Sequence, residues 1–266
     1  MSGWESYTSR METIGTTKRD MWVSHTKASI SRRLLASPSC RLVKVNGVEQ
    51  YLSVVHKTKS ELDTKRIAAL PGEHLVHGGL VDFAEHKWLI TAVDVDDEVY
   101  EKGFMRLCNH VLRWIGQDGK LKEKWCVVED GTKYLIGEKS SDIMTLGDAR
   151  IAVTVGRDED TREIHRGQRF LIDDPGSGEV LAYEVSKPNR FFNVYDNAGV
   201  FRYILTETNV IAEDNLELRI ADYAKWRPPQ KTDGDHKDSD KTLGEIVDTA
   251  NKDAQTPPDD NKEGWL

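Results

Sequence analysis

An acidic run, Asp94, Asp96, Asp97 and Glu98, lies between two strand-like segments, WLITAV and GFMRLCN. Alternate residues of an extended chain share one face, so Asp94 and Asp96 could offer oxygens to one cation such as calcium. The run lacks the spacing and the turn glycine of an EF-hand loop. Acidic residues between strands are more often a solvated turn. The sequence therefore predicts a plain hairpin here, and the acidic stretches at 158–163 and 173–174 are interpreted in the same way.

Three histidines are the best candidates for a metal site. His74, His77 and His86 are close enough in the chain to meet across a loop and a strand. Zinc sites of known pattern add an H-E-x-x-H helix or a C-x-x-C pair, and neither occurs here. Scattered histidines are therefore favoured over a zinc site.

Other catalytic patterns are missing as well. Cys40, Cys108 and Cys126 lie in or beside apolar, strand-like segments, where a thiolate is disfavoured, and their odd number without C-x-x-C spacing predicts reduced, packed thiols. The chain has no G-x-S-x-G elbow and no phosphate-binding glycine loop. We therefore expect no enzymatic activity, no cofactor and no metal.

Aromatic side chains could instead supply stacking faces for a carbohydrate or a nucleic acid. The candidates are Trp88, Trp114, Trp125, Tyr183, Phe191, Phe192 and Tyr195, with Arg190 and Arg202 nearby. Aromatic residues in alternating strands are more often core or cross-strand pairs. The formal net charge of −8 opposes non-specific binding to phosphate over most of the surface, although a local basic patch is allowed.

Composition and length indicate a folded protein made in the cytoplasm. With 266 residues, of which 38% are hydrophobic, the chain can bury a sizeable core. Its first residues lack the apolar segment of a signal peptide, and no run of eighteen apolar residues occurs. We therefore expect no membrane span.

The patterns predict a mainly β chain in four parts. Residues 1–37 form a basic helical arm, 38–109 a small antiparallel β-barrel, 110–227 an immunoglobulin-like β-sandwich of about seven strands ending at 215–223, and 228–266 a disordered acidic tail.

Short motifs place the elements. Thr17 or Asp20 can cap the arm helix, and Pro38 stops it. Asn46-Gly47 and residues 117–119 predict tight hairpin turns. The polar stretch Lys57 to Gly72 predicts a charged loop, either simply solvated or reaching a neighbouring subunit. The arm likewise either packs on its own domain or docks on a neighbour.

Several of these segments resemble structural proteins encoded in the head and tail assembly region of tailed phages and prophages of Gram-positive bacteria. The resemblance rests on WLITAVDVDDEVYEKGFMRLCNHVLRWIGQDGKLKEKWCVVED, RFLID and NLELRIADY, and covers about residues 5–225. LVHGGLVDFAEHKWLITAVD also resembles the connector pattern in which a glycine turn precedes a strand, although Leu80 replaces the usual acidic or polar residue. The resemblance implies a helical arm, a head-closure-like barrel, an immunoglobulin-like domain and no active site.

The expected function is a non-enzymatic virion protein, a head-tail connector or neck (head-closure) subunit that forms a ring between portal and tail. Its expected partners are further copies of itself, portal or adaptor proteins, tail proteins and packaged DNA in the channel, with no membrane contact. The expected location is the virion, after synthesis in the host cytoplasm. The candidate intersubunit contacts are Trp22, Ile30, Leu34, Lys57, Lys59, Lys65 and Arg66. The alternative is a carbohydrate- or receptor-binding accessory protein of the virion that uses exposed aromatics of the second domain.

The tail generates a first prediction. Residues 228–266 hold almost no apolar anchors, so a chain truncated after Arg227 should fold with an unchanged melting temperature, and limited proteolysis of the full chain should remove the tail first. A truncated chain that failed to fold would contradict this.

Overall fold

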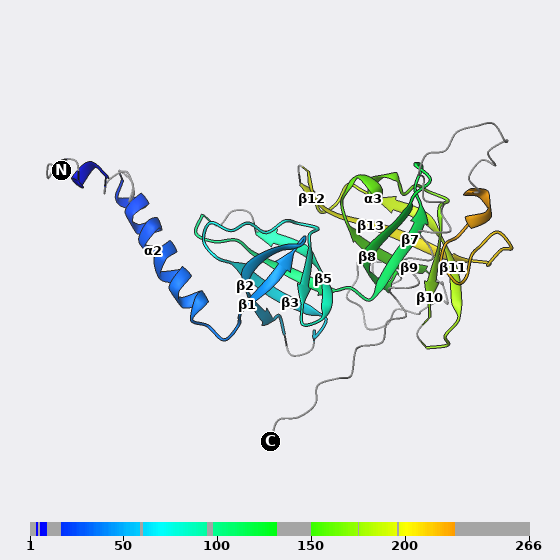
Figure 1. The fold of residues 1–266 in the computed structure, drawn as a ribbon, viewed down its shortest axis with the longest axis horizontal. Helices are drawn as coiled ribbons and strands as arrows, with labels where there is room; N and C mark the ends of the chain where they lie inside the picture. The colour runs from blue at the N-terminus through cyan, green and yellow to red at the C-terminus, as the bar shows by residue number, and fades with distance from the viewer. Residues whose placement is uncertain are drawn as a thin grey trace, which may run out of the picture. The chain divides into compact units, whose positions relative to one another are not determined.

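The computed structural model describes residues 4, 6–9, 17–58, 61–94, 98–131, 150–174, 176–195 and 197–226. In this part of the chain one long helix is followed by two antiparallel β-sheets (Figure 1). The protein is thus mainly β, as the strand patterns predicted. The tail predicted for 228–266 lies outside the described residues.

The helix, α2, spans Lys18–Leu35 and begins where the sequence indicated. Thr17 and Asp20 form a reciprocal capping box: the backbone N–H of Asp20 donates to Thr17 Oγ1 at 3.1 Å, and the backbone N–H of Thr17 donates to Asp20 Oδ2 at 3.1 Å. Arg32 and Arg33 lie in the last turn, where positive charge suits the helix dipole. The helix ends before Pro38.

The first sheet closes into a six-stranded barrel, so the predicted small barrel is confirmed. Its strands are β1 (Cys40–Val45), β2 (Val48–His56), β3 (Thr64–Ala69), β4 (Leu80–Phe83), β5 (His86–Asp94) and β6 (Lys102–Leu107), in the order β1-β2-β3-β6-β5-β4 with β4 paired to β1. Asn46 and Gly47 both have positive φ, as their predicted turn requires. Strands β5 and β6 pair as the predicted hairpin, and Asp96 and Asp97 between them lie outside the described residues.

The prediction of a loop from Lys57 to Gly72 was wrong in its second half, which contains β3. Thr64, Ile67 and Ala69 are the buried residues of this strand. Only Ile67 among them is a large apolar residue, so the strand lacks the strong alternation of large apolar residues that marks its neighbours.

The second sheet contains seven strands. They are β7 (His110–Ile115), β8 (Leu121–Asp130), β9 (Arg150–Gly156), β10 (Arg169–Asp173), β11 (Val180–Asn189), β12 (Val194–Tyr195) and β13 (Ala198–Thr208). The order is β10-β11-β13-β9-β8-β7, and β12 pairs with β13. A short helix, α3 (Glu159–Glu163), follows β9, with Asp158 as its N-cap, and the 3-10 helix η2 spans Tyr223–Trp226.

This sheet curls until its first and last strands meet. Trp114 of β7 and Phe170 of β10 pack edge to face with ring centroids 5.9 Å apart, and His110 Nε2 lies 3.2 Å from the carbonyl oxygen of Asp173. The immunoglobulin-like sandwich is therefore not confirmed, because one curled sheet surrounds the core. Period-two alternation shows which residues face inward, but it does not distinguish one curled sheet from two facing sheets.

The strand predicted at 215–223 was also wrong. Only a single bridge, between Asn215 and Ile220, forms there. The side chain of Asn215 accepts a hydrogen bond from the backbone of Leu218 at 3.0 Å, which favours a turn over an extended strand.

The two sheets touch through glycine backbone. The turn at His77-Gly78 lies so close to Gly156 and Gly199 that a Cβ atom on Gly78 would come within 1.9 Å of the Gly199 carbonyl oxygen. The Gly199 N–H donates to the His77 carbonyl at 2.9 Å, and the Arg157 N–H donates to the Gly199 carbonyl at 2.9 Å. We call this contact the glycine junction. It explains why the glycine turn of the LVHGGLVDF segment is needed.

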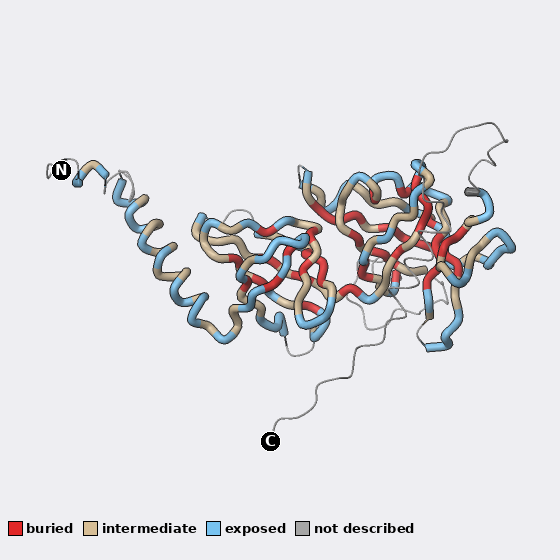
Figure 2. The backbone as a smooth tube through the Cα atoms, viewed as in Figure 1, coloured by how far each residue is buried: buried red, intermediate tan, exposed pale blue. Residues whose placement is uncertain are grey.

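Side chains reinforce the glycine junction. Buried residues from both sheets form one small cluster: Leu89, Cys108, Val127 and Val200, with Leu80 packed against it. The link between the sheets is only Cys108-Asn109. Asn109 exchanges hydrogen bonds with both backbone groups of Val128, at 2.9 and 2.8 Å. Figure 2 shows buried segments throughout both sheets and none along α2.

The glycine junction generates a prediction with a matched control. Gly78 and Gly72 both have positive φ, but a Cβ on Gly72 would meet nothing within 4 Å. Gly72→Ala should therefore cost about 1–2 kcal/mol from backbone strain alone, whereas Gly78→Ala should cost more than about 3 kcal/mol because it also forces the two backbones apart. Urea unfolding followed by tryptophan fluorescence measures both, and equal losses would contradict the steric argument.

Candidate interaction surface

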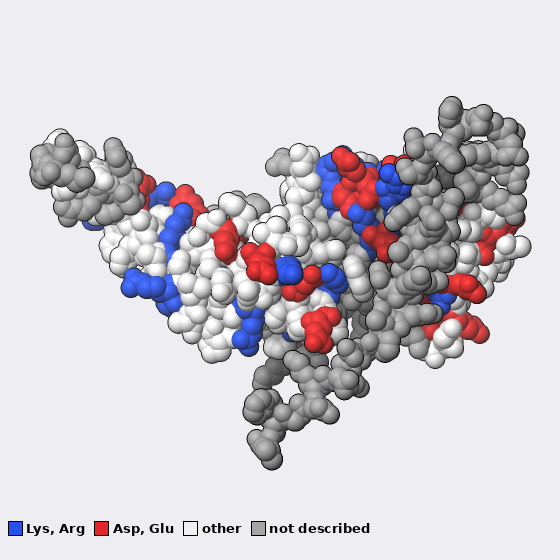
Figure 3. Space-filling model, in the orientation of Figure 1, with Lys and Arg blue, Asp and Glu red and all other residues white. Residues whose placement is uncertain are grey.

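Helix α2 is a long helix that is poorly buried on its own chain. None of its residues is buried, the Trp22 side chain is 64% exposed, and Ile30 and Leu34 are half-buried. The helix contains one acidic residue, Asp20, and five basic residues, Lys18, Arg19, Lys27, Arg32 and Arg33. Figure 3 shows Lys and Arg side chains along the visible face of this helix. An ion pair of 2.7 Å between Arg19 and Glu98 connects its first turn to the segment before β6.

The C-terminal end of α2 forms one wall of a groove on the outside of the barrel. The hollow measures about 360 Å³ and is lined by Leu34, Ser53, Val55, Arg66, Ile67, Ala68, Tyr100 and Lys102. We call it the arm groove. Neighbouring strands set its composition, because Val55 pairs with Arg66 and Ser53 pairs with Ala68 across β2 and β3. The lining therefore combines apolar side chains with two cations, Arg66 and Lys102.

The structure brings two of the predicted contact residues together. Leu34 of the arm and Arg66 of β3 line the same groove, although they are 32 positions apart in the numbering. Trp22 and Ile30 lie on the same helix but do not line the groove. Among the described residues, the Arg66 side chain has no hydrogen-bond or ion-pair partner, so its guanidinium is available to a ligand or a second protein.

The predicted lysines are held within their own barrel. Lys57 pairs with Glu61 at 2.7 Å and lies 5.6 Å from the centre of the Phe104 ring. Lys65 lies 5.1 Å from the centre of the Trp88 ring, with its Nζ 3.3 Å from His56 Nδ1. Lys59 lies outside the described residues. Tyr100 and Lys102, which sequence reasoning did not single out, complete the groove, and only the barrel register could have found them.

The sequence also did not indicate which aromatics are exposed. Phe191, Phe192 and Tyr195 are exposed by 88%, 69% and 64%. Trp114 and Phe170, by contrast, are in the core of the second sheet. The β11–β13 connection therefore presents three aromatic rings to solvent, and we call it the aromatic tip.

The histidines considered as candidates for a metal site contact other groups of the described chain. His74 Nδ1 lies 2.6 Å from Glu101 Oε1. His77 Nε2 donates to the Thr91 carbonyl at 2.9 Å, and burial lowers the pKa of His77. In the part of the chain that the structure describes, no group of three histidine, cysteine or acidic residues could hold a metal ion. No helix in that part is long and apolar enough to span a bilayer.

The three cysteines are free thiols, as the sequence predicted. Burial raises the pKa of Cys108 to about 12 and also raises that of Cys126, so neither side chain is a ready nucleophile at neutral pH. Cys40 is only partly buried, and its pKa is raised as well, mainly by burial.

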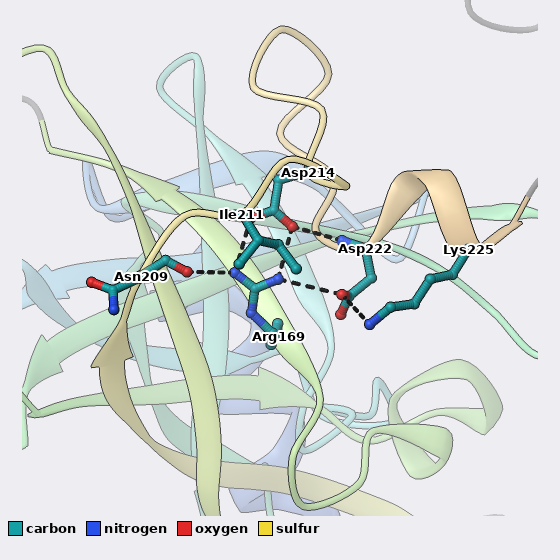
Figure 4. Close-up of polar contacts among 6 residues, drawn as sticks. All are labelled: Arg169, Asn209, Ile211, Asp214, Asp222 and Lys225. Atoms are coloured by element: carbon teal, nitrogen blue, oxygen red, sulfur yellow. Dashed lines mark hydrogen bonds and ion pairs between the residues drawn. The ribbon is translucent and has the colours of Figure 1, made fainter.

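A polar network around Arg169 holds the last described segment against the second sheet (Figure 4). The Arg169 guanidinium donates hydrogen bonds to both carboxylate oxygens of Asp214, at 2.8 and 2.9 Å, and to the Asn209 carbonyl at 2.8 Å. Asp214 also accepts from the backbone N–H groups of Ile211 and Asp222, both at 2.9 Å. The Asp214 side chain is 0% exposed, so a hydrogen-bonded charge is fully buried here.

This network is structural. A hollow of about 230 Å³ lies beside it and contains Glu163, His165 and Lys225. Lys225 Nζ donates a hydrogen bond to Asp222 Oδ1 at 2.6 Å. The Asp214 carboxylate accepts four hydrogen bonds from its neighbours. Burial alone would raise the pKa of Asp214, but these hydrogen bonds hold it below its ordinary value.

Comparison of the chain with protein-family models, with curated proteins and with solved structures found no match.

The Arg169 network generates a prediction about pH. Because the pKa of Asp214 is lowered in the folded state, its contribution is present above the unfolded value of about 3.9 and is lost as pH falls through the lower folded value. Asp214→Asn should cost about 3 kcal/mol of unfolding free energy at pH 7, and this cost should shrink in acid. The control is Asp82→Asn, which breaks an exposed pair with Lys87 and should cost less than about 1 kcal/mol. Urea titrations from pH 7 to acid test this, and a constant cost at every pH would contradict it.

Proposed function

We propose that this chain is a non-enzymatic structural subunit of a tailed-phage virion, placed in the head-tail connector or neck, where copies join into a ring between portal and tail. The observation that carries the proposal is helix α2, which has 18 residues and none of them buried. Most helices in proteins are stabilised by packing an apolar face. A helix that exposes Trp22 and Met21 by 64% and 47% on its own subunit is suited to packing on another.

The two sheets supply what such a subunit needs from its scaffold. A ring requires each copy to hold its contact surfaces at a fixed spacing. The glycine junction and the two-residue link Cys108-Asn109 provide that rigidity. The barrel also agrees with the head-closure-like barrel that the sequence resemblance implies.

Charge is divided between the arm and the rest of the chain. The arm helix is basic, while the whole chain has a formal net charge of −8. A basic arm on an acidic body can face packaged DNA in a channel, or the acidic surface of a neighbouring subunit, without drawing the whole protein onto nucleic acid. Portal or adaptor proteins on one side and tail proteins on the other are the proposed partners, and the virion is the proposed location.

A second candidate function is supported by the aromatic tip. Phe191, Phe192 and Tyr195 are well exposed, and Trp125 is 38% exposed. Exposed rings of this kind could bind a cell-wall carbohydrate or another host receptor. In that case the chain would be an accessory protein of the virion that acts in adsorption.

Deletion of residues 1–37 tests the proposed function. Because α2 buries nothing, the shortened chain should keep its β circular dichroism signal and its melting temperature within a few degrees. Particles assembled with it should contain DNA-filled heads and no attached tails, as seen by electron microscopy. Two point variants refine the test: Trp22→Ala should reduce tail attachment, and His25→Ala, at an exposed position of the same helix, should not.

Two results would count against the connector assignment. If particles assembled from a chain without residues 1–37 still carried tails and were infectious, the connector assignment would be wrong. A defect confined to adsorption, with normal tails, would favour the accessory function.

A further inference from the structure

We propose that the aromatic tip of one copy docks into the arm groove of a second copy, so that this chain associates head to tail. The inference rests on the proposed function, because it names the two surfaces through which copies of the subunit would join. It commits the arm groove to one occupant, the rings of Phe191 and Phe192.

The aromatic tip is already ordered for binding. Strand β12 pairs with β13 through Val194 and Tyr195, and the Val200 N–H donates to the Asn193 carbonyl at 3.0 Å. Tyr195 stacks on His77 with ring centroids 5.7 Å apart, and His77 is fixed by its hydrogen bond to Thr91. Figure 1 shows the β12 hairpin extending beyond the sheet. These contacts hold the segment next to Phe191 and Phe192 in place, and a contact made by a pre-ordered segment costs less ordering entropy.

Phe191 and Phe192 have the chemistry of an interface anchor. They are adjacent, and they are exposed by 88% and 69%. Large aromatic side chains that cluster in the open are a common mark of protein–protein contact sites. Neither ring is among the stacked or edge-to-face aromatic pairs of the described residues, so neither is engaged by another aromatic ring there.

The arm groove offers a complementary surface. Val55, which is 41% exposed, and Ala68 give the groove an apolar lining. Arg66 and Lys102 add two cations to the same lining. The Lys102 ammonium already lies 4.6 Å from the centre of the Tyr100 ring, so the groove holds a cation at the distance at which it attracts an aromatic face. Arg66 can stack on a phenyl ring in the same way.

The two surfaces do not fill each other within one chain. The tip belongs to the second sheet and the groove to the barrel, and in the same structure the rings are exposed while the groove is open. The contact therefore joins different patches of two identical chains. Repetition of such a contact gives a closed ring if the rotation closes and a filament if it does not.

The experiment uses the purified full-length chain in sedimentation velocity over a concentration series reaching the millimolar range. The tip variant is Phe191→Ser with Phe192→Ser, and the groove variant is Arg66→Glu. Matched controls are Val48→Ser, which changes an apolar residue 68% exposed elsewhere on the barrel, and Arg41→Glu, which reverses an exposed charge on β1. Arg66→Lys keeps a cation in the groove and should weaken association less than Arg66→Glu.

The wild type and both controls should associate as concentration rises, and the tip and groove variants should each associate about tenfold more weakly or worse. An equimolar mixture of the tip and groove variants should give heterodimers and nothing larger, because only one intact contact is possible. All substituted residues are exposed, so melting temperatures should stay near that of the wild type, which shows that the loss is not unfolding.

Three outcomes would overturn the inference. The first is a groove variant that associates like the wild type, which would make the contact tip to tip. The second is a wild type that stays monomeric throughout, which leaves the neck assignment to be decided separately by the particles without an arm. The third is a tip variant that keeps self-association but loses binding to purified Gram-positive cell walls, which would assign the rings to a carbohydrate.

Discussion

The approach of two backbones at the glycine junction sets the geometry of the described chain. Gly78 of the barrel and Gly156 of the second sheet let the two sheets come together at a distance that a side chain at either position would prevent. The backbone bond from Gly199 to His77 then fixes the approach, and Arg106, which pairs with Glu129 of β8, adds a charged tie between the sheets. Surfaces on either sheet are useful to an assembly only if their separation is constant. The junction is the physical reason that the arm groove and the aromatic tip can act as parts of one rigid subunit.

The features of the fold that were predicted correctly depend on the chemistry of residues close together in the chain. Thr17 caps α2 and Asn46-Gly47 turns the first hairpin because the side chain or the allowed φ of each residue determines the conformation nearby. Features that depend on contacts between residues far apart in the sequence could not be predicted in the same way. Strand β3 was missed because only one of its three buried residues, Ile67, is large and apolar. The predicted sandwich was not confirmed, because alternation carries no information about which strands become neighbours.

The candidate surface shows the same division. Leu34 was singled out because it lies on the apolar side of a basic helix, and Arg66 because it lies in a charged stretch, and the fold brings both to one groove. Lys57 and Lys65 came from the same stretch but are bound to aromatic rings of their own barrel. Tyr100 and Lys102 could be placed there only from the strand register. Composition also could not separate Phe170, which is in the core, from Phe191, which is in solvent.

The closure of the barrel has a consequence for how this protein avoids the wrong kind of association. A closed barrel has no open strand edge, and in the second sheet the outer strands β7 and β10 lie against each other. Exposed strand edges are the usual templates for aggregation, because any extended chain can pair with them. With the barrel closed and β7 packed against β10, copies of this chain present fewer strand edges on which they could grow by strand addition. Recognition is then left to side chains, whose identity, unlike the backbone, can distinguish the right neighbour from a wrong one.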